Sequence, residues 1–361
     1  MNDKTNAIMP QGQPINPFEY TRPIVDAEKT MARPHAVRAI VNALYRESVV
    51  SVMGSWQTGK TGLLLSLREQ FDRTVYIKSY GVPSEVLSNL QDNIDRQIPD
   101  IFTDIPMDGN DTRALVDLFH SLAKRASIVF LVDALPMPRE IAYQFLSAIR
   151  IYLMESLAET SKTTHKFVIA SSVDVVTLTQ EMNPDLSPFN IAIPVYLEDF
   201  SDAEVRTFIQ RLAPGEFSEW EMKKISEYTG GHPFLVQFVC HHLYDKPDKK
   251  REEILKNADT VVKELRLEET WNIKSMLHHI GNSQELGEAI KTLKKILRIG
   301  NILRRRRVPF SRVARHIQTL YLQGAIREDG NGYCEIRNPL YEVVLRRALP
   351  ELESKIIGFY I

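Results

Sequence analysis

The sequence predicts an α/β fold built on a doubly wound parallel sheet, followed by an α-helical lid and a small C-terminal domain. Three observations predict it. Apolar runs of strand length alternate with helical patterns, one of these runs leads into a glycine-rich turn, and helices alone follow from Ser201. Alternating strands and helices are typical of a parallel sheet, in which ligands bind at the carboxyl ends of the strands.

The clearest motif lies in the stretch VVSVMGSWQTGKTGLLLSL at residues 49–67. It matches G-x-x-x-x-G-K-[ST], preceded by a β-branched run and followed by an apolar helix, which is the context of a phosphate-binding loop. The glycines let the backbone curl so that its N–H groups surround a phosphate. The lysine reaches the β- and γ-phosphates, and the threonine offers its hydroxyl to Mg²⁺. The motif therefore predicts a P-loop NTPase that binds ATP or ADP with Mg²⁺ through Gly54, Ser55, Gln57, Thr58, Gly59, Lys60, Thr61 and Gly62.

Composition limits the other functional classes. The chain of 361 residues carries 45 Lys and Arg against 46 Asp and Glu, so no overall charge attracts it to nucleic acid or to a membrane. Cys240 and Cys334 are its two cysteines, a number that argues against a disulfide framework or a zinc site. Neither a signal peptide nor a run of 18 apolar residues is present, so we expect a cytoplasmic protein without a membrane span.

Residues 1–30 are rich in Asn, Pro and Gln and predict an extended arm. Phe18 and Tyr20 either anchor this arm to the core or contact a partner. An amphipathic helix over 32–44 precedes the first strand, and helices in this place often line an adenine pocket. Arg33 and Pro34 are therefore candidates for the base pocket; alternatively they only start the helix.

A second strand, at 127–133, ends in Asp133. Alone, this residue could simply form a turn, but with a phosphate loop upstream we expect it to hold Mg²⁺ together with Thr61. Many ATPases place a Glu next, to activate the attacking water, whereas this chain has Ala134. Loss of a general base typically lowers the rate by about 10²–10⁴-fold, so ATP hydrolysis is expected to be slow unless Glu140, Glu155 or a residue from another subunit supplies the base. Ser171, after the strand at 166–170, is the candidate sensor of the γ-phosphate.

The other elements follow from periodicity and capping signals. Further strands are predicted at 73–79 and 191–197, with helices between them at 112–125 and 139–159. The lid is predicted to contain helices at 202–212, 219–229, 233–243 and 250–265. Between its second and third helices, Thr229-Gly-Gly-His-Pro233 forms a tight turn. The turn is sufficient to explain these residues, but His232 and Pro233 are also candidates for sensing the nucleotide from the lid.

Four segments together resemble the bacterial AAA-like domain family, within the STAND and origin-recognition-type group of P-loop ATPases. They are GSWQTGKT, IVFLVD, SPFNIAIPVYLEDFS and TGGHPFLVQFVC, and the resemblance spans about residues 15–265. In related signalling ATPases the lid proline packs beside the adenine, and the protein switches between ADP and ATP forms. The resemblance implies this role for Pro233, with His232 beside it. The chain departs from the family's acidic continuation at Ala134.

The C-terminal residues predict a winged helix: helices at 284–299 and 311–323, then a hairpin at 325–336 and a helix at 339–349. A local basic cluster accompanies them, and its side chains could contact DNA phosphates, dock on the core or simply face solvent. The candidate contacts are Arg304, Arg305, Arg306, Arg307, Arg312 and Arg315. The predicted domains are therefore an arm at 1–30, a P-loop core at 31–200, a lid at 201–268 and a winged helix at 269–361.

The functional hypothesis is an ATP-binding molecular switch of the AAA-like, STAND type, whose nucleotide state controls self-assembly or binding of a protein partner. One alternative is a DNA-binding ATPase of the replication-initiator or transposition-regulator type, acting through the winged helix. Another is a nucleotide-bound scaffold that does not hydrolyse ATP.

Overall fold

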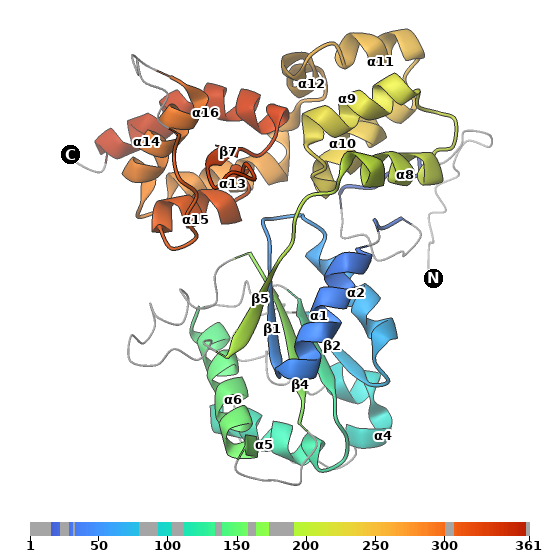
Figure 1. Cartoon of the computed structure of the whole chain (residues 1–361), viewed down its shortest axis with the longest axis vertical. Coiled ribbons are helices and arrows are strands. Elements are labelled where there is room, and N and C mark those ends of the chain that lie inside the picture. The colour runs from blue at the N-terminus through green and yellow to red at the C-terminus, as the bar shows by residue number, and fades with distance from the viewer. Residues whose placement is uncertain are drawn as a thin grey trace, which may run out of the picture.

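The computed structural model describes residues 16–21, 29–31, 33–78, 93–102, 112–133, 139–157, 164–172, 191–299 and 307–358, with only the backbone described at 139–141, 357 and 358. These residues form a lower body built on a sheet and an upper body built mainly of helices, and the chain passes from the one to the other after β5 (Figure 1). The candidates Arg304, Arg305 and Arg306 and the SPFN segment at 187–190 lie outside the described residues.

Five parallel strands make the sheet of the lower body. In the order in which they pair, they are β2 (Thr74–Lys78), β3 (Val129–Asp133), β4 (Lys166–Ser171), β1 (Val49–Met53) and β5 (Ala192–Tyr196). All residues of β1 and β3 are buried, as their continuous apolar runs predict for strands covered on both faces. The predicted parallel sheet is confirmed.

Helices cover both faces of this sheet (Figure 1). On one face, α1 (Pro34–Arg46) and α2 (Lys60–Leu67) pack with Val50 and Val52 in one hydrophobic cluster. On the other face, α5 (Thr112–Ala123) and α6 (Arg139–Leu157) pack in a second cluster. The short elements of this body are η1 (Arg68–Gln70) and α4 (Pro99–Phe102). The sheet is therefore doubly wound, with its carboxyl edge directed toward the upper body.

The lid begins directly after β5. Its helices are α8 (Asp202–Leu212), α9 (Glu219–Thr229), α10 (Pro233–Tyr244), α11 (Asp248–Ile254) and α12 (Ala258–Glu264). Ser201 caps α8 as predicted: its hydroxyl accepts from the Glu204 N–H at 3.3 Å, while the Glu204 carboxylate accepts from the Ser201 N–H at 2.8 Å. The single helix predicted over 250–265 is wrong. Asn257 interrupts it because its side chain accepts from the Thr260 N–H at 2.9 Å and starts a new helix.

The C-terminal residues add helices and one hairpin. The elements are η3 (Leu267–Glu269), α13 (Trp271–Gly281), α14 (Leu286–Leu297), α15 (Arg315–Leu322), β6 (Ile326–Glu328), β7 (Cys334–Ile336) and α16 (Pro339–Gly358). The predicted hairpin is confirmed: β6 and β7 pair antiparallel, and Gly330 and Gly332 in the turn have φ of 76° and 82°. The helix predicted over 311–323 starts later, the last helix is longer than predicted, and α13 was not predicted.

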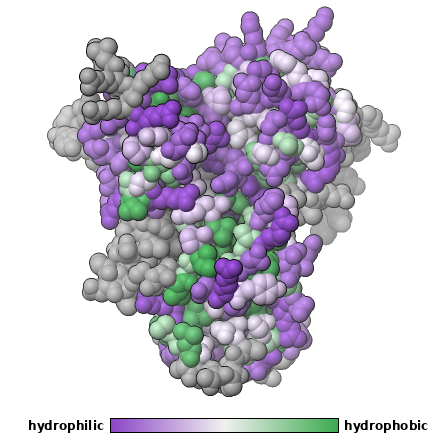
Figure 2. Space-filling view, viewed as in Figure 1, coloured by the Kyte–Doolittle hydropathy of each residue, from purple (hydrophilic) through white to green (hydrophobic). Residues whose placement is uncertain are grey.

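Lid and C-terminal helices share one hydrophobic core, which includes Ile225, Val261 and Leu345. Phe18 of the arm belongs to it and is 1% exposed, with its ring edge-on to Phe217 at 5.9 Å. This contact favours the anchoring role for Phe18. Figure 2 shows that hydrophilic residues dominate the visible face of the upper body. Of the helices in the described residues, none combines the length and the apolar character that a membrane crossing requires.

Candidate nucleotide-binding site

The phosphate loop connects β1 to α2. Glycine is required at Gly59 because of the backbone conformation and at Gly54 because of close packing. Gln57 and Gly59 both have positive φ, at 57° and 86°, so the chain turns sharply just before α2. Glycine adopts this conformation without steric cost. At Gly54 the reason is packing, because a Cβ atom there would lie 2.9 Å from Thr58 Oγ1 and 3.2 Å from Leu197 Cβ. The loop thus has the tight curl that a phosphate requires.

Lys60 points into the loop. Its Nζ donates to the carbonyl oxygens of Gly54 at 2.8 Å and Ser55 at 2.6 Å, and the residue is 8% exposed. Burial lowers the pKa of Lys60 to about 7, although the charge of Asp133 acts in the opposite direction. A phosphate beside the amine would restore its positive charge. The buried lysine therefore fits an anionic ligand.

Asp133 lies at the end of β3 and is buried. Its Oδ2 atom accepts a hydrogen bond from Thr61 Oγ1 at 2.8 Å, so the two predicted metal ligands lie side by side. Oxygen ligands of this kind suit Mg²⁺, which keeps several waters and takes its remaining ligands from phosphates. Within the described part of the chain, no cluster of three or more His, Cys, Asp or Glu side chains could hold a metal. The pair of Thr61 and Asp133 fits the Mg²⁺ of a bound nucleotide.

A third side chain reaches the same carboxylate. Tyr76 Oη, from β2, donates to Asp133 Oδ2 at 2.5 Å. The strand at 73–79 was predicted, but no role for Tyr76 was. The sequence feature that could have indicated this role is a side chain with a hydroxyl between apolar residues of strand β2, which pairs with the strand that ends in Asp133.

The other catalytic candidates lie at the same edge or outside the described side chains. Ser171 ends β4 directly beside the start of the loop, where its carbonyl accepts from the Gly54 N–H at 3.3 Å. This is the place expected for a sensor of the γ-phosphate. Glu140 belongs to α6, but its side chain, like Ala134, lies outside what the structure describes. Both catalytic roles stay predictions.

Arg33 does more than start a helix. Its guanidinium donates to the carbonyls of Thr58 at 2.8 Å and Glu198 at 2.7 Å, and it lies 4.0 Å from the centre of the Phe200 ring. Burial lowers the pKa of Arg33 to about 10. Arg33 thereby joins the phosphate loop to the segment that enters the lid. Pro34 is the exposed first residue of α1.

The lid turn places His232 against the phosphate loop, and its role in sensing nucleotide stays a prediction. Gly231 permits this placement, because a Cβ atom there would lie 1.8 Å from the Phe200 carbonyl oxygen. The His232 ring is buried near the Trp56 backbone, although neither ring nitrogen makes a hydrogen bond of normal geometry with any described residue. Burial, reinforced by the charge of Arg337, lowers the pKa of His232 to about 3. Pro233, which follows, is the first residue of α10.

The neutral His232 predicts acid sensitivity. Its pKa is about 3 in the folded protein and 6.5 when unperturbed, so below pH 6.5 the unfolded chain binds the extra proton. The contribution of neutral His232 to the free energy of unfolding is complete above pH 6.5 and decreases as the pH falls. At about 1.36 kcal/mol per pH unit, the free energy of unfolding is lower by about 3 kcal/mol at pH 4. Urea unfolding of wild type and His232→Gln at pH 7, 5 and 4 measures it. The variant should lose less stability on acidification, whereas His35→Gln, on the exposed side of α1, should follow wild type. Parallel losses in all three proteins would contradict the assignment.

The outward side of the loop is covered by the C-terminal residues. The Trp56 ring stacks on His279 of α13, with ring centres 6.0 Å apart and planes 11° from parallel. Gln57 Oε1 accepts a hydrogen bond from Asn272 Nδ2 at 2.8 Å, and Asn272 Oδ1 accepts one from the hydroxyl of Tyr341 at 2.7 Å. Successive residues of the loop are thus contacted by side chains more than 200 positions away in the sequence.

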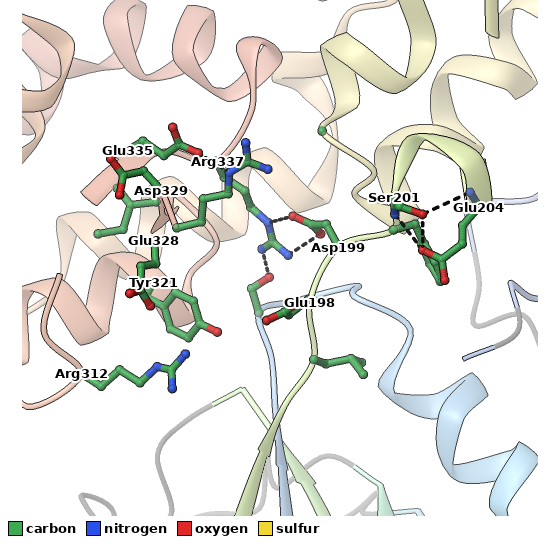
Figure 3. Close-up of a pocket in the computed structure, with 16 residues that line it drawn as sticks. Glu198, Asp199, Ser201, Glu204, Arg312, Tyr321, Glu328, Asp329, Glu335 and Arg337 are labelled. Atoms are coloured by element: carbon green, nitrogen blue, oxygen red, sulfur yellow. Dashed lines mark hydrogen bonds and ion pairs between the residues drawn. The ribbon is translucent and has the colours of Figure 1, made fainter. Parts of the chain in front are cut away.

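Arg337 is the main link between the hairpin and the loop (Figure 3). Its Nε and Nη2 atoms donate to the two carboxylate oxygens of Asp199 at 2.7 and 2.6 Å, and its Nη1 donates to Ser55 Oγ. Burial alone would raise the pKa of Asp199, but the charge and hydrogen bonds of Arg337 outweigh it and lower that pKa. The pair is almost fully buried, and neither residue was among the predicted site residues.

A cavity of about 540 Å³ lies next to this ion pair. It is bounded by Ser55, by the segment at 197–201 and by the hairpin (Figure 3). Its lining is largely charged, with Glu198, Glu328 and Arg312 among the residues that face it. The hairpin therefore meets the core through a few polar contacts around open space rather than through a close-packed apolar surface.

Residues 125–302 of the chain match the AAA-like domain family. Two solved structures share the fold. A Walker-type ATPase of Pyrococcus abyssi is 15% identical with a TM-score of 0.55, and the match covers 90% of this chain and 99% of that one. The ORC2 protein of Aeropyrum pernix is 13% identical with a TM-score of 0.51, and the match covers 90% of this chain and 94% of that one. No curated protein sequence matches significantly. The chain has the P-loop ATPase fold.

The matched residues include Asp133, the lid and the whole of α13 and α14, but the match starts after the phosphate loop. The basic candidates lie beyond the match, and the described ones, Arg307, Arg312 and Arg315, have different surroundings. Arg312 lies 3.7 Å from the centre of the Tyr196 ring and so faces β5, whereas Arg307 is 3.8 Å from Asp329 of the hairpin turn. Arg315 is the exposed first residue of α15.

Proposed function

We propose that this chain is an ATP-binding switch, in which nucleotide at the phosphate loop controls how the C-terminal residues dock on the core. Docking in turn exposes or covers a surface for self-assembly or for a protein partner. The observation that carries this proposal is the position of Ser55, which is held from both sides: Lys60 binds its carbonyl from inside the loop, and Arg337 binds its hydroxyl from outside.

Nucleotide would act on this arrangement through Lys60. The lysine of a phosphate loop binds the β- and γ-phosphates, so Lys60 must turn away from the carbonyls of Gly54 and Ser55 when ATP enters. The Ser55 carbonyl then keeps the hydroxyl of Thr58, at 2.9 Å, as its donor. A change of backbone at Ser55 moves the hydroxyl that Arg337 binds. Phosphate binding inside the loop is thereby coupled to docking outside it.

Adenine nucleotide is the ligand that the fold supports best. The Aeropyrum pernix ORC2 protein was solved as ADPNP and ADP complexes. In this chain Mg²⁺ would be held by Thr61 and Asp133 and would neutralise charge on the phosphates. Ala134 stands where many ATPases have a catalytic Glu, which supports slow or partner-dependent hydrolysis.

DNA binding is the second candidate, and one observation bears on it directly. Arg312 at the start of the predicted recognition helix lies over Tyr196, and Tyr321 of that helix packs on the same ring with centres 6.2 Å apart. This face is therefore turned toward β5. Arg312 and Arg315 are nevertheless exposed, so DNA phosphates could contact these two side chains while the C-terminal residues stay docked.

The switch predicts different particles with different nucleotides. Light scattering with Mg²⁺-ATP, with Mg²⁺-ADP and without nucleotide, each with and without duplex DNA, should give a different mass for at least one nucleotide state. Hydrogen exchange should change at α13 and at Arg337, which contact the loop. Bound nucleotide with identical mass and exchange in all states would refute the switch. A mass change that needs DNA and weakens steeply with salt would favour the DNA-binding ATPase.

A further inference from the structure

We propose that Tyr76 is a positioning residue of the Mg²⁺-nucleotide site, an inference that rests on the nucleotide function proposed above. Its hydroxyl donates to Asp133 Oδ2 at 2.5 Å, and Thr61 Oγ1 donates to the same oxygen at 2.8 Å. Two hydroxyls from different elements thus fix one carboxylate. Tyr76 acts through Asp133 rather than on the nucleotide itself.

The strand pattern explains why a tyrosine reaches this place. Val75 and Ile77 point into the cluster on the α5 and α6 side, so Tyr76 points to the opposite face, where α2 lies. In the parallel register Tyr76 is opposite Leu131, and Asp133 is opposite Lys78 at the carboxyl edge. The long phenol ring spans this two-residue offset along the sheet. A phenylalanine would fill the apolar part of the site equally well, so the hydroxyl serves the carboxylate.

The backbone of Tyr76 is itself held in place. β2 is an edge strand of the sheet, and the side-chain amide of Gln97 pairs with its open edge. Gln97 Oε1 accepts from the Tyr76 N–H at 2.9 Å, and Gln97 Nε2 donates to the Tyr76 carbonyl at 2.8 Å. An amide that satisfies both backbone groups of one residue fixes that residue against sliding or twisting. Tyr76 is therefore preorganised before any ligand arrives.

The hydrogen bond from Tyr76 to Asp133 would help to orient a ligand of the Mg²⁺ site. A threonine binds Mg²⁺ through an oxygen lone pair, so its O–H can still donate to Asp133, and the Tyr76 hydroxyl supplies a second hydrogen bond to the same carboxylate oxygen. Tyr76 keeps a hydrogen bond to the carboxylate throughout and sets the orientation in which Asp133 meets the water shell of the ion. Partners of this kind typically contribute about 10–100-fold to metal affinity. With Ala134 following it, Asp133 has no acidic neighbour at the next position.

The test is a magnesium titration of Tyr76→Phe. Binding of a fluorescent ATP analogue is measured against free Mg²⁺ concentration and also in EDTA, with Tyr228→Phe as the matched control. Tyr228 likewise loses a buried hydroxyl, which donates to the Leu255 carbonyl in the lid, far in sequence from the metal site. We expect the half-saturating Mg²⁺ concentration of Tyr76→Phe to rise about tenfold. Binding in EDTA should equal wild type, and excess Mg²⁺ should restore full affinity.

Each result is decisive. An unchanged Mg²⁺ midpoint in Tyr76→Phe overturns the inference, as does an equal loss of binding with and without Mg²⁺, because that pattern marks a general structural defect. Failure of the wild type to bind the analogue under any condition rejects the nucleotide function itself, which is a different outcome. Should Tyr76→Phe fold poorly, Gln97→Glu removes the donor to the Tyr76 carbonyl and should shift the midpoint in the same direction by a smaller factor; an unchanged midpoint there also overturns the inference.

Discussion

Lys60→Ala is expected to abolish binding of ATP and ADP and, with it, every nucleotide-dependent change in particle mass. The side chain supplies the positive charge at the centre of the loop, in a buried site where a charge–phosphate contact is screened little by water. Its loss should raise the dissociation constant for Mg²⁺-ATP by at least about 100-fold, which corresponds to about 2.7 kcal/mol at about 1.36 kcal/mol per factor of ten. Calorimetric titration measures the affinity, and light scattering measures the mass.

Two controls separate this effect from damage to the loop. Lys60→Met keeps most of the side-chain volume without the charge and should behave like Lys60→Ala. Lys291→Ala removes an exposed lysine that pairs with Glu288 on α14, and it should bind and assemble like wild type. If Lys60→Ala still assembles in an ATP-dependent way, nucleotide does not act through this loop, and the switch is wrong.

Local patterns predicted the parts of the fold that local interactions decide. The bounds of α8 and α9 agree with the prediction, because the serine caps at Ser201 and Ser218 and the glycine after α9 are signals within one or two turns. The phosphate loop could be recognised for the same reason. The predicted helix over 250–265 failed where Asn257 competed with a continuous periodic pattern.

Contacts across the chain could not be predicted in this way. Arg337 and Ser55 are 282 positions apart, and Asn272 and Gln57 are 215 apart. Arg337 directly follows β7 and carries no motif, so only the packing of the hairpin on the core shows that it is buried against Asp199. Tyr76 is a similar case, because its role depends on the register between β2 and β3. Within the described part of the basic cluster, Arg312 lies over Tyr196 of β5 whereas Arg307 lies beside Asp329 of the hairpin turn.

The site therefore has a local part and an assembled part. The local part, the loop and its magnesium ligands, predicts what binds. In the assembled part, Arg337 and Asn272 contact Ser55 and Gln57. These contacts support the proposal that nucleotide binding changes how the C-terminal residues dock. Reciprocity follows: if nucleotide weakens docking, loss of docking must strengthen nucleotide binding by the same free energy.

Arg337→Ala tests this reciprocity and should have the second-largest effect. It leaves the buried Asp199 carboxylate without its cation, a change that typically costs about 3–5 kcal/mol. We expect the hairpin to leave the core, which hydrogen exchange at 55–57 and small-angle scattering should detect. Because Ser55 is then held only from inside the loop, affinity for Mg²⁺-ATP should rise. The expected increase is about 5–150-fold if the coupling free energy between docking and nucleotide binding is about 1–3 kcal/mol.

A double-mutant cycle with Asp199→Ala identifies the cause. Each single variant leaves one buried charge unpaired, so the double variant should lose less stability than the sum of the two. Arg347→Ala is the matched control, because that arginine pairs with Asp259 and Glu268 at a partly exposed site on α16 and should contribute about 0–1 kcal/mol. If Arg337→Ala loosens the hairpin while nucleotide affinity stays at the wild-type value, Ser55 does not transmit docking to the loop. Nucleotide and the C-terminal residues would then be independent, and assembly would need another trigger.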